Sequence, residues 1–219
     1  MLSRFDRRVV PESILEFIRR CQKRAPCRLG GGAALAGAYL AHRMTGDLDL
    51  FFDDADRMRG LVGALPEVAS AIDAKLTVLR DVGYLVRARL ESAEREIEVD
   101  VVHDPVPDVE TPPAPLEGVV VKSLADLRAS KLTCILSRSE PRDLVDLYFL
   151  ERAGHPSEQV IDLALRKDAG TDPGVLAWLL SQFPTQPLPE MLEPLTTEEL
   201  EGFRRQLSAR LRALSTTRK

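Results

Sequence analysis

The sequence predicts an α+β fold, in which a mixed or antiparallel sheet with flanking helices is followed by a helical C-terminal half. Apolar and polar residues alternate over 47–52, 83–90 and 95–103, as in half-buried strands. Apolar residues recur at helical spacing around these segments, and after the sheet region only helical spacing continues. We therefore expect two domains, an α/β domain over residues 1–121 and a helical domain over residues 122–219.

The composition excludes several classes of protein. The 219 residues can enclose a sizeable core, and 30 Lys and Arg against 34 Asp and Glu give a net charge of −4. That balance does not indicate a coat of nucleic acid or a polybasic membrane anchor. Three cysteines without a C-x-x-C pair argue against a disulfide scaffold or a zinc ribbon. With no signal-peptide pattern and no apolar run of about 18 residues, we expect a soluble, cytoplasmic protein with no membrane partner.

The first elements follow from the apolar spacing. An amphipathic helix is expected over 10–24, where a proline near its start is tolerated. A short strand over 27–29 then leads into three glycines. The expected elements that follow are a helix over 33–42, a strand over 47–52 and a helix over 55–72.

The remaining elements complete the sheet and then turn helical. Strands are expected over 75–80, 83–90 and 95–103, and five prolines make 104–118 an irregular connector. A short strand over 119–121 precedes the second half, in which Trp178 and Phe183 are expected in the core. The expected helices there span 123–137, 142–152, 156–168, 173–182 and 196–214.

Three carboxylates form the main candidate site. Alternation on a strand places Asp47 and Asp49 on one face, about 7 Å apart. Adjacent carboxylates repel each other unless a cation lies between them, and Mg²⁺ prefers oxygen ligands. If strand 95–103 lies beside strand 47–52, Asp100 joins them. A two-metal Mg²⁺ site, with ions about 4 Å apart, would bind a triphosphate and activate an attacking oxygen.

A glycine turn precedes these acids. At Gly31 and Gly32 the backbone N–H groups can approach phosphate oxygens at a helix N-terminus, where the dipole also favours an anion. The turn lacks the G-K-[ST] of a Walker loop and the G-x-G-x-x-G of a Rossmann fold. A tight turn without a ligand remains the structural alternative.

Each of these features alone has an ordinary explanation. Asp47 and Asp49 can be a polar strand face, Asp100 an exposed acid at a strand end, and Asp54-Ala55-Asp56 is a second D-x-D at a helix start. The combination of a glycine turn, a D-x-D strand some 15 residues later and a third strand acid is far more specific.

Two strings in this chain resemble the AbiEii/AbiGii-type nucleotidyltransferase family, which belongs to the DNA-polymerase-β-like nucleotidyltransferase superfamily and includes toxins of toxin–antitoxin pairs. The first string runs from Gly31-Gly32-Ala33-Ala34-Leu35 to His42-Arg43-Met44-Thr45-Gly46-Asp47-Leu48-Asp49-Leu50-Phe51. The second is Lys131, Arg138 and Pro141-Arg142-Asp143-Leu144-Val145-Asp146-Leu147-Tyr148. The resemblance covers residues 28–150 and implies a nucleotidyltransferase fold.

The resemblance also implies roles for individual residues. Gly31 and Gly32 would contact nucleotide phosphates, and Asp47, Asp49 and Asp100 would be metal ligands. Asp100 could also be the general base for the acceptor hydroxyl.

In the second string, Lys131 would reach the triphosphate and Asp143 would orient it or the neighbouring arginines. We include Arg43 and Arg142 among the nucleotide-binding residues. Their structural alternatives are a supporting contact near Asp47 for Arg43, a solvated helix face for Lys131, and a charged helix start for Arg142 and Asp143.

One departure from the family pattern affects function. Ala33 stands in the nucleotide-binding turn where the family has Ser or Thr, whose hydroxyl can bond a phosphate oxygen. The alternative function is therefore a catalytically decayed module that binds a nucleotide or a partner.

The favoured function is transfer of a nucleoside monophosphate from an NTP, such as ATP, to an acceptor hydroxyl. The resemblance to toxin members implies an RNA acceptor such as a tRNA 3′ end, with a protein or a small-molecule hydroxyl as alternatives, and implies an antitoxin as the partner of a toxin. A metal-dependent phosphohydrolase is a weaker third hypothesis, since the chain has only three histidines.

Overall fold

The computed structural model describes residues 2–217, which divide into two compact units. The first runs to Ser123 and contains the sheet, and the second begins at Leu124 and is helical. Among the described residues, no helix is long and apolar enough to cross a membrane.

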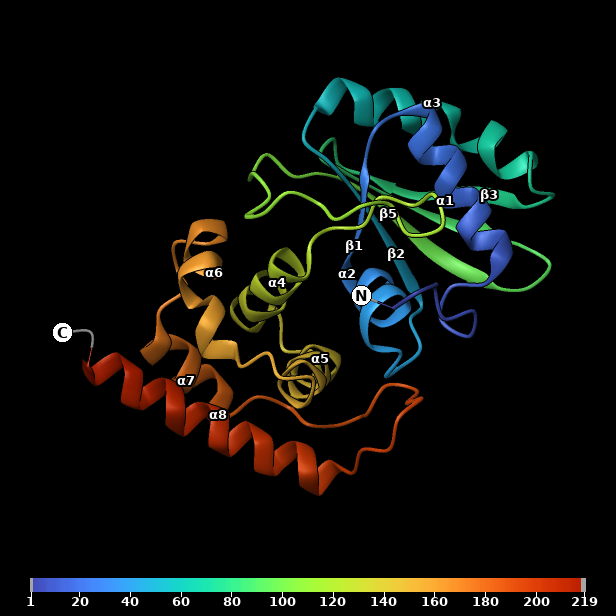
Figure 1. Ribbon diagram of the computed structural model, residues 1–219. Coiled ribbons are helices and arrows are strands. Elements are labelled where there is room, and N and C mark those ends of the chain that lie inside the picture. The colour runs from blue at the N-terminus through green and yellow to red at the C-terminus, as the bar shows by residue number, and fades with distance from the viewer. Residues whose placement is uncertain (1, 218–219) are drawn as a thin grey trace. The chain divides into compact units, whose positions relative to one another are not determined.

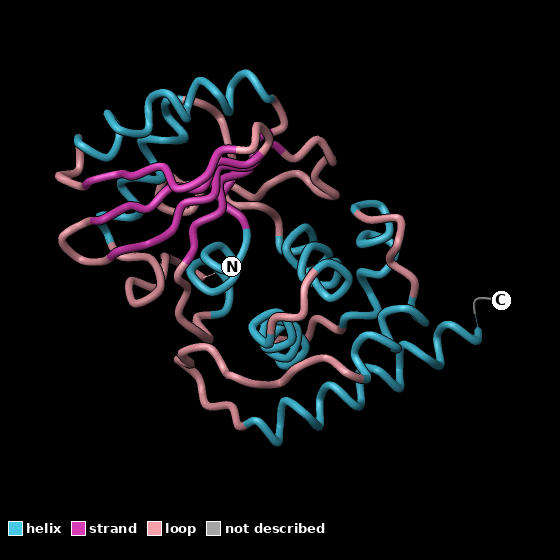
Figure 2. Tube along the Cα trace, turned by 180° about the vertical axis from the view of Figure 1, so that it is seen from behind, coloured by secondary structure: helices cyan, strands magenta, loops and turns pink. Residues whose placement is uncertain are grey.

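The N-terminal unit is built on one mixed five-stranded sheet with the order β1-β2-β5-β4-β3 (Figure 2). The two central strands, β2 and β5, are parallel, and each of the other neighbouring pairs is antiparallel. The strands are β1 (Arg28–Gly30), β2 (Asp47–Phe52), β3 (Lys75–Asp81), β4 (Leu85–Glu91) and β5 (Glu96–His103). The predicted α+β fold with a mixed sheet is confirmed.

Two helices cover one face of this sheet, α1 (Glu12–Arg24) and α3 (Ala55–Ser70), which lie beside each other (Figure 1). In β2, Leu48, Leu50 and Phe52 are buried, whereas the residues between them are partly exposed. The core therefore lies on the helix-covered face, and the polar residues of β2 lie on the other. This alternation is what places the candidate acids together.

The glycine turn connects β1 to a short helical segment. Gly31–Ala34 form α2, and Leu35–Leu40 continue as a π-helix that ends at Ala41, which has a left-handed φ of 53°. The predicted helix over 33–42 therefore exists but begins earlier and is wound more widely. Wide turns of this kind occur often near functional sites.

The C-terminal unit consists of helices, as predicted. Its helices and the one 3-10 turn are α4 (Leu124–Ser137), α5 (Pro141–Arg152), the turn Ser157–Val160, α6 (Ile161–Lys167), α7 (Pro173–Ser181) and α8 (Thr197–Thr217). Phe183 is buried as expected.

Two local expectations are wrong. Trp178 is 61% exposed, because α7 buries Leu176, Ala177 and Leu180, and Trp178 lies about 200° around the helix from Leu176. Residues 119–121 do not form the predicted strand. Val121 pairs with Leu29 and Val119 pairs with Leu116, and each of these is an isolated bridge that does not continue into a ladder.

A buried hydroxyl links α7 to α8. The Oγ of Ser208 donates to the carbonyl of Ala177 at 2.7 Å. We expect Ser208→Ala to lower the free energy of unfolding by about 1–2 kcal/mol, because the Ala177 carbonyl loses its donor in a buried setting. Urea titration measures this. Ser215→Ala, also on α8, is the control, because the Ser215 hydroxyl makes a solvent-exposed bond to the carbonyl of Arg212, so a change under about 0.5 kcal/mol is expected. Equal effects of the two substitutions would contradict the assignment.

Candidate active site

Four carboxylates share the open face of the two central strands. The parallel register of β2 and β5 pairs Asp47 with Glu98 and Asp49 with Asp100. Neighbouring strands lie about 4.8 Å apart, so alternation and register together place these acids in two adjacent pairs on one face. The expectation that strand 95–103 lies beside strand 47–52, with Asp100 next to the D-x-D pair, is confirmed.

Two neighbouring side chains hold these acids. The buried hydroxyl of Thr45 donates to Oδ1 of Asp47 at 2.7 Å. The guanidinium of Arg87, on β4, donates to both oxygens of Asp100 at 2.8 and 2.7 Å. Hydrogen bonding to Asp100, ahead of the nearby charges of Glu98 and Asp47, raises the pKa of Arg87. Arg87 thus supplies a positive charge beside the acids, which the sequence analysis did not foresee.

The glycine turn lies directly against the D-x-D strand. A Cβ at Gly31, where φ is +58°, would lie 1.7 Å from Oδ2 of Asp49. A Cβ at Gly32 would lie 2.9 Å from Nη2 of Arg43 and 3.1 Å from the hydroxyl of Thr45. The two glycines are therefore required by the side chains packed on them, and the turn brings its backbone to the carboxylates.

Arg43 is buried, with 2% of its surface exposed, and its Nη1 donates to the carbonyl of Met44 at 2.9 Å. This packing against Gly32 agrees with the supporting role that the sequence offered as an alternative. Ala33, the third residue of α2, is also buried. Its methyl side chain has no hydroxyl that could bond a ligand.

The donor chemistry of this face suits Mg²⁺. Magnesium takes one or two carboxylates together with substrate phosphates and water, and Asp47 and Asp49 are oxygen donors on adjacent positions of one strand face. Among residues 2–217, no three acidic, histidine or cysteine side chains are already grouped as a metal cage. Asp100 accepts one hydrogen bond from Arg87 on each oxygen, and each oxygen keeps a lone pair with which it could join a metal site.

The second string of motif residues forms a buried ion cluster within the C-terminal unit. Nζ of Lys131, on α4, lies 3.0 Å from Asp143 and 2.6 Å from Asp146, which are both fully buried on α5. Arg138 donates to both oxygens of Asp143 at 2.7 and 2.9 Å. Burial is the largest single influence on the pKa of Arg138 and lowers it, but hydrogen bonding to Asp143 together with the nearby negative charges outweighs burial and leaves the pKa raised. Lys131 is therefore not a solvated lysine.

Arg142 lies at the start of α5 and pairs with Glu140. Its Nε donates to Glu140 at 2.5 Å near the start of α5, on a partly exposed side chain. The structure thus brings Lys131 and Asp143 together as the motif suggests. The cluster also includes Asp146 and Arg138 of the same string, and Asp143 and Asp146 lie three residues apart on one face of α5.

The N-terminal unit carries a glycine turn packed on paired strand carboxylates, and the C-terminal unit carries a buried lysine–aspartate cluster. Both features fit the nucleotidyltransferase class of fold. The family model of the nucleotidyl transferase AbiEii toxin, of type IV toxin–antitoxin systems, matches residues 14–218. The chain belongs to this family. A search of curated proteins finds no match.

Solved structures share the fold. JHP933 from Helicobacter pylori is 18% identical, with a TM-score of 0.58, and the match covers 95% of this chain and 93% of that one. MenT4, a nucleotidyltransferase toxin from Mycobacterium tuberculosis, is 14% identical, with a TM-score of 0.60, and the match covers 92% and 84%. At these identities the likeness supports the fold.

The contact between Gly31 and Asp49 gives a first test of the site. We expect Gly31→Ala to lower the free energy of unfolding by about 1–3 kcal/mol, because the new methyl group meets the Asp49 carboxylate at a left-handed φ. Urea denaturation measures the change. Gly63→Ala is the control, since a Cβ there meets nothing within 4 Å on helix α3 and should be neutral or stabilising. A Gly31 variant as stable as the Gly63 variant would refute the packing.

The buried cluster gives a second test. We expect Lys131→Met to lower the free energy of unfolding by about 3–5 kcal/mol, because it removes a countercharge from two buried carboxylates. Lys75→Met is the control, because that lysine is 74% exposed and lies 4.0 Å from Glu91, so less than about 1 kcal/mol is expected. Thermal and urea unfolding of both variants are compared, and equal losses would argue against a structural role for the Lys131 cluster.

Proposed function

We propose that this chain is a metal-dependent nucleotidyltransferase that transfers a nucleoside monophosphate from an NTP, such as ATP, to an acceptor hydroxyl. The observation that carries the proposal is the register of β2 and β5, which places Asp100 beside Asp49 against the glycine turn. Membership of the AbiEii toxin family supports the reaction class and the further proposal that the chain acts as the toxin of a toxin–antitoxin pair. The proposed acceptors are an RNA such as a tRNA 3′ end, or a protein.

In the proposed reaction the acceptor oxygen attacks the α-phosphorus of the NTP. A new phosphorus–oxygen bond forms, the bond from the α-phosphorus to the bridging oxygen breaks, and pyrophosphate leaves. The proton of the acceptor hydroxyl passes to the carboxylate of Asp100, whose two oxygens also accept the hydrogen bonds of Arg87.

The chain's other residues bind and orient. Asp47 and Asp49 would hold Mg²⁺, with Asp100 as a third ligand in a two-metal arrangement, and the metal would neutralise charge on the triphosphate. Gly31 and Gly32 would offer backbone N–H groups to phosphate oxygens at the start of α2. Thr45 keeps the Asp47 carboxylate oriented through the bond to Oδ1.

The residues outside this face have supporting roles in the proposal. Arg43 would stabilise the turn from behind Gly32, and Lys131 and Asp143 would act on the triphosphate, with Arg142 as a further nucleotide contact. Any such role for Lys131 has to compete with its ion pairs to Asp143 and Asp146.

Loss of the D-x-D pair tests the proposal. We expect Asp47→Ala combined with Asp49→Ala to abolish transfer of label from α-labelled NTPs to total cell RNA or protein in Mg²⁺, because the metal loses its ligands. The second D-x-D supplies the control, since Asp54→Ser combined with Asp56→Ala removes two acids while serine keeps the N-cap of α3. An unchanged rate in the Asp47/Asp49 variant would overturn the assignment.

The second candidate function is a decayed module that binds nucleotide or a partner without turnover. Ala33 favours it, because this buried position lacks the hydroxyl of the family pattern. Calorimetry with Mg²⁺ and each NTP separates the two functions when it is combined with the transfer assay. Binding without transfer to any cellular RNA or protein would support the decayed module, and measurable transfer would remove it.

A further inference from the structure

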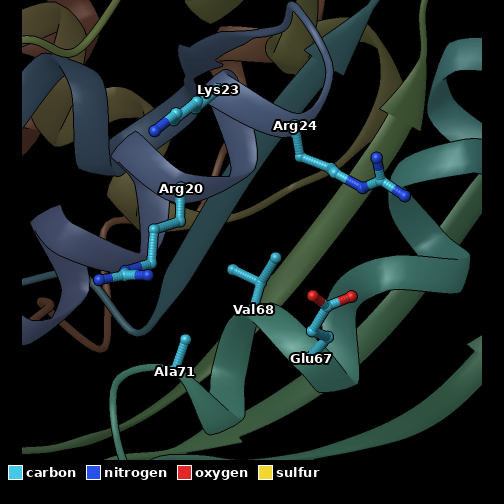
Figure 3. Close-up of a pocket in the computed structure, with 6 residues that line it drawn as sticks. All are labelled: Arg20, Lys23, Arg24, Glu67, Val68 and Ala71. Atoms are coloured by element: carbon cyan, nitrogen blue, oxygen red, sulfur yellow. The ribbon is translucent and has the colours of Figure 1, made fainter.

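A second charged cleft lies on the opposite side of the sheet from the acids. It has a volume of about 320 Å³ and runs between α1 and α3, the two helices that cover the apolar face. Arg20, Lys23 and Arg24 on α1 form one wall, and Glu67, Val68 and Ala71 on α3 form the other (Figure 3). The volume falls in the range of small-ligand sites.

Helical spacing explains why the cations line one wall. Positions 20, 23 and 24 share a face of α1, opposite the buried residues of that helix. Arg20 lies 2.8 Å from Glu16, but neither Lys23 nor Arg24 has a carboxylate within ion-pair distance among residues 2–217. Glu67 faces them without an ion pair to any described residue. The cleft therefore keeps an excess of positive charge.

A neighbouring cleft of about 230 Å³ extends the same positive surface. It is lined by Arg24, Ala25, Pro26, Arg57 and Gly60, so Arg24 belongs to both clefts. The dipole of α1 favours cations in its last turn, which accounts for Lys23 and Arg24 alone. It does not account for Arg57, which lies in the first turn of α3, where the dipole disfavours a cation. A bound anion would be attracted both to Lys23 and Arg24 on α1 and to Arg57 on α3.

We propose that the α1–α3 cleft is a second, non-catalytic binding site for a phosphate-bearing ligand of nucleotide size. The lysine and arginines pair with phosphate oxygens, for which guanidinium groups are well shaped. Ala71, with the small exposed part of the otherwise buried Val68, offers an apolar surface to a ring, and Glu67 accepts hydrogen bonds from the N–H or hydroxyl groups of the ligand. The acids of β2 and β5 face the other side of the sheet, so a ligand in this cleft is separate from the proposed donor nucleotide.

The test isolates the cleft by using the full-length Asp47→Ala/Asp49→Ala variant as background. ATP and pyrophosphate are titrated into this protein by calorimetry, with and without the added pair Lys23→Gln and Arg24→Gln. We expect ATP to bind the background, and the added pair to weaken its binding at least about tenfold through loss of two charged phosphate contacts. The pair Arg205→Gln and Arg212→Gln, exposed on α8, removes the same charge and should change the affinity less than about twofold.

The outcomes divide clearly. Tighter binding of ATP than of pyrophosphate supports a nucleotide ligand that also uses Val68, Ala71 and Glu67, whereas equal affinities support a site for the polyphosphate alone. No binding to the background variant, or binding that Lys23→Gln/Arg24→Gln leaves unchanged, overturns the proposal. Unfolding curves establish that each variant is folded. Failure of the transfer assay would leave this result untouched, because no step of the titration requires turnover.

Discussion

The parallel pairing of β2 with β5 is the constraint on which the N-terminal unit depends. In this register Asp47, Asp49, Glu98 and Asp100 meet on one face, and like charges at this spacing repel. Neighbouring side chains reduce the repulsion between these carboxylates. Thr45 donates to Asp47, and Arg87 reaches across from β4 to Asp100. The turn at Gly31 packs directly against the Asp49 side chain, so backbone and neutral or positive side chains surround the acids.

The same face explains how far the sequence could lead. Alternation fixes which side of a strand a residue occupies. This is enough to predict that Asp47 and Asp49 share one side of β2, and that Glu98 and Asp100 share one side of β5. Strand order and register depend on pairing between segments about 50 residues apart, which no local pattern encodes. For the same reason the bond from Arg87 to Asp100 was not foreseen, because it crosses between strands. A large aromatic residue in an apolar helix is usually buried, which is why residue type alone predicts a buried Trp178. The buried side of α7 is instead set by Leu176, Ala177 and Leu180, and Trp178 lies on the other side.

In the C-terminal unit, the sequence predicts the helices and the motif residues but not the burial of those residues. Its helices were predictable from spacing, and the motif already named Lys131 and Asp143. Helical spacing does not predict how deeply these residues are buried. Asp143 and Asp146 are fully inaccessible, and both pair with the ammonium group of Lys131. A buried cluster of this kind stabilises poorly as a sum of charges but penalises any change to one member. The cluster therefore stabilises the packing of α4 against α5, whatever else these residues do.

The contact at the glycine turn also orders the ways in which this site can be lost. Because a Cβ at position 31 would overlap the carboxylate at position 49, the two positions cannot drift independently. With Asp49 in place, a methyl group at 31 forces the carboxylate or the turn to shift, whereas a shorter side chain at 49 would leave room for it. The free-energy cost of a side chain at 31 therefore depends on which residue stands at 49. In this chain, which has Gly31 and Asp49, that cost is at its highest.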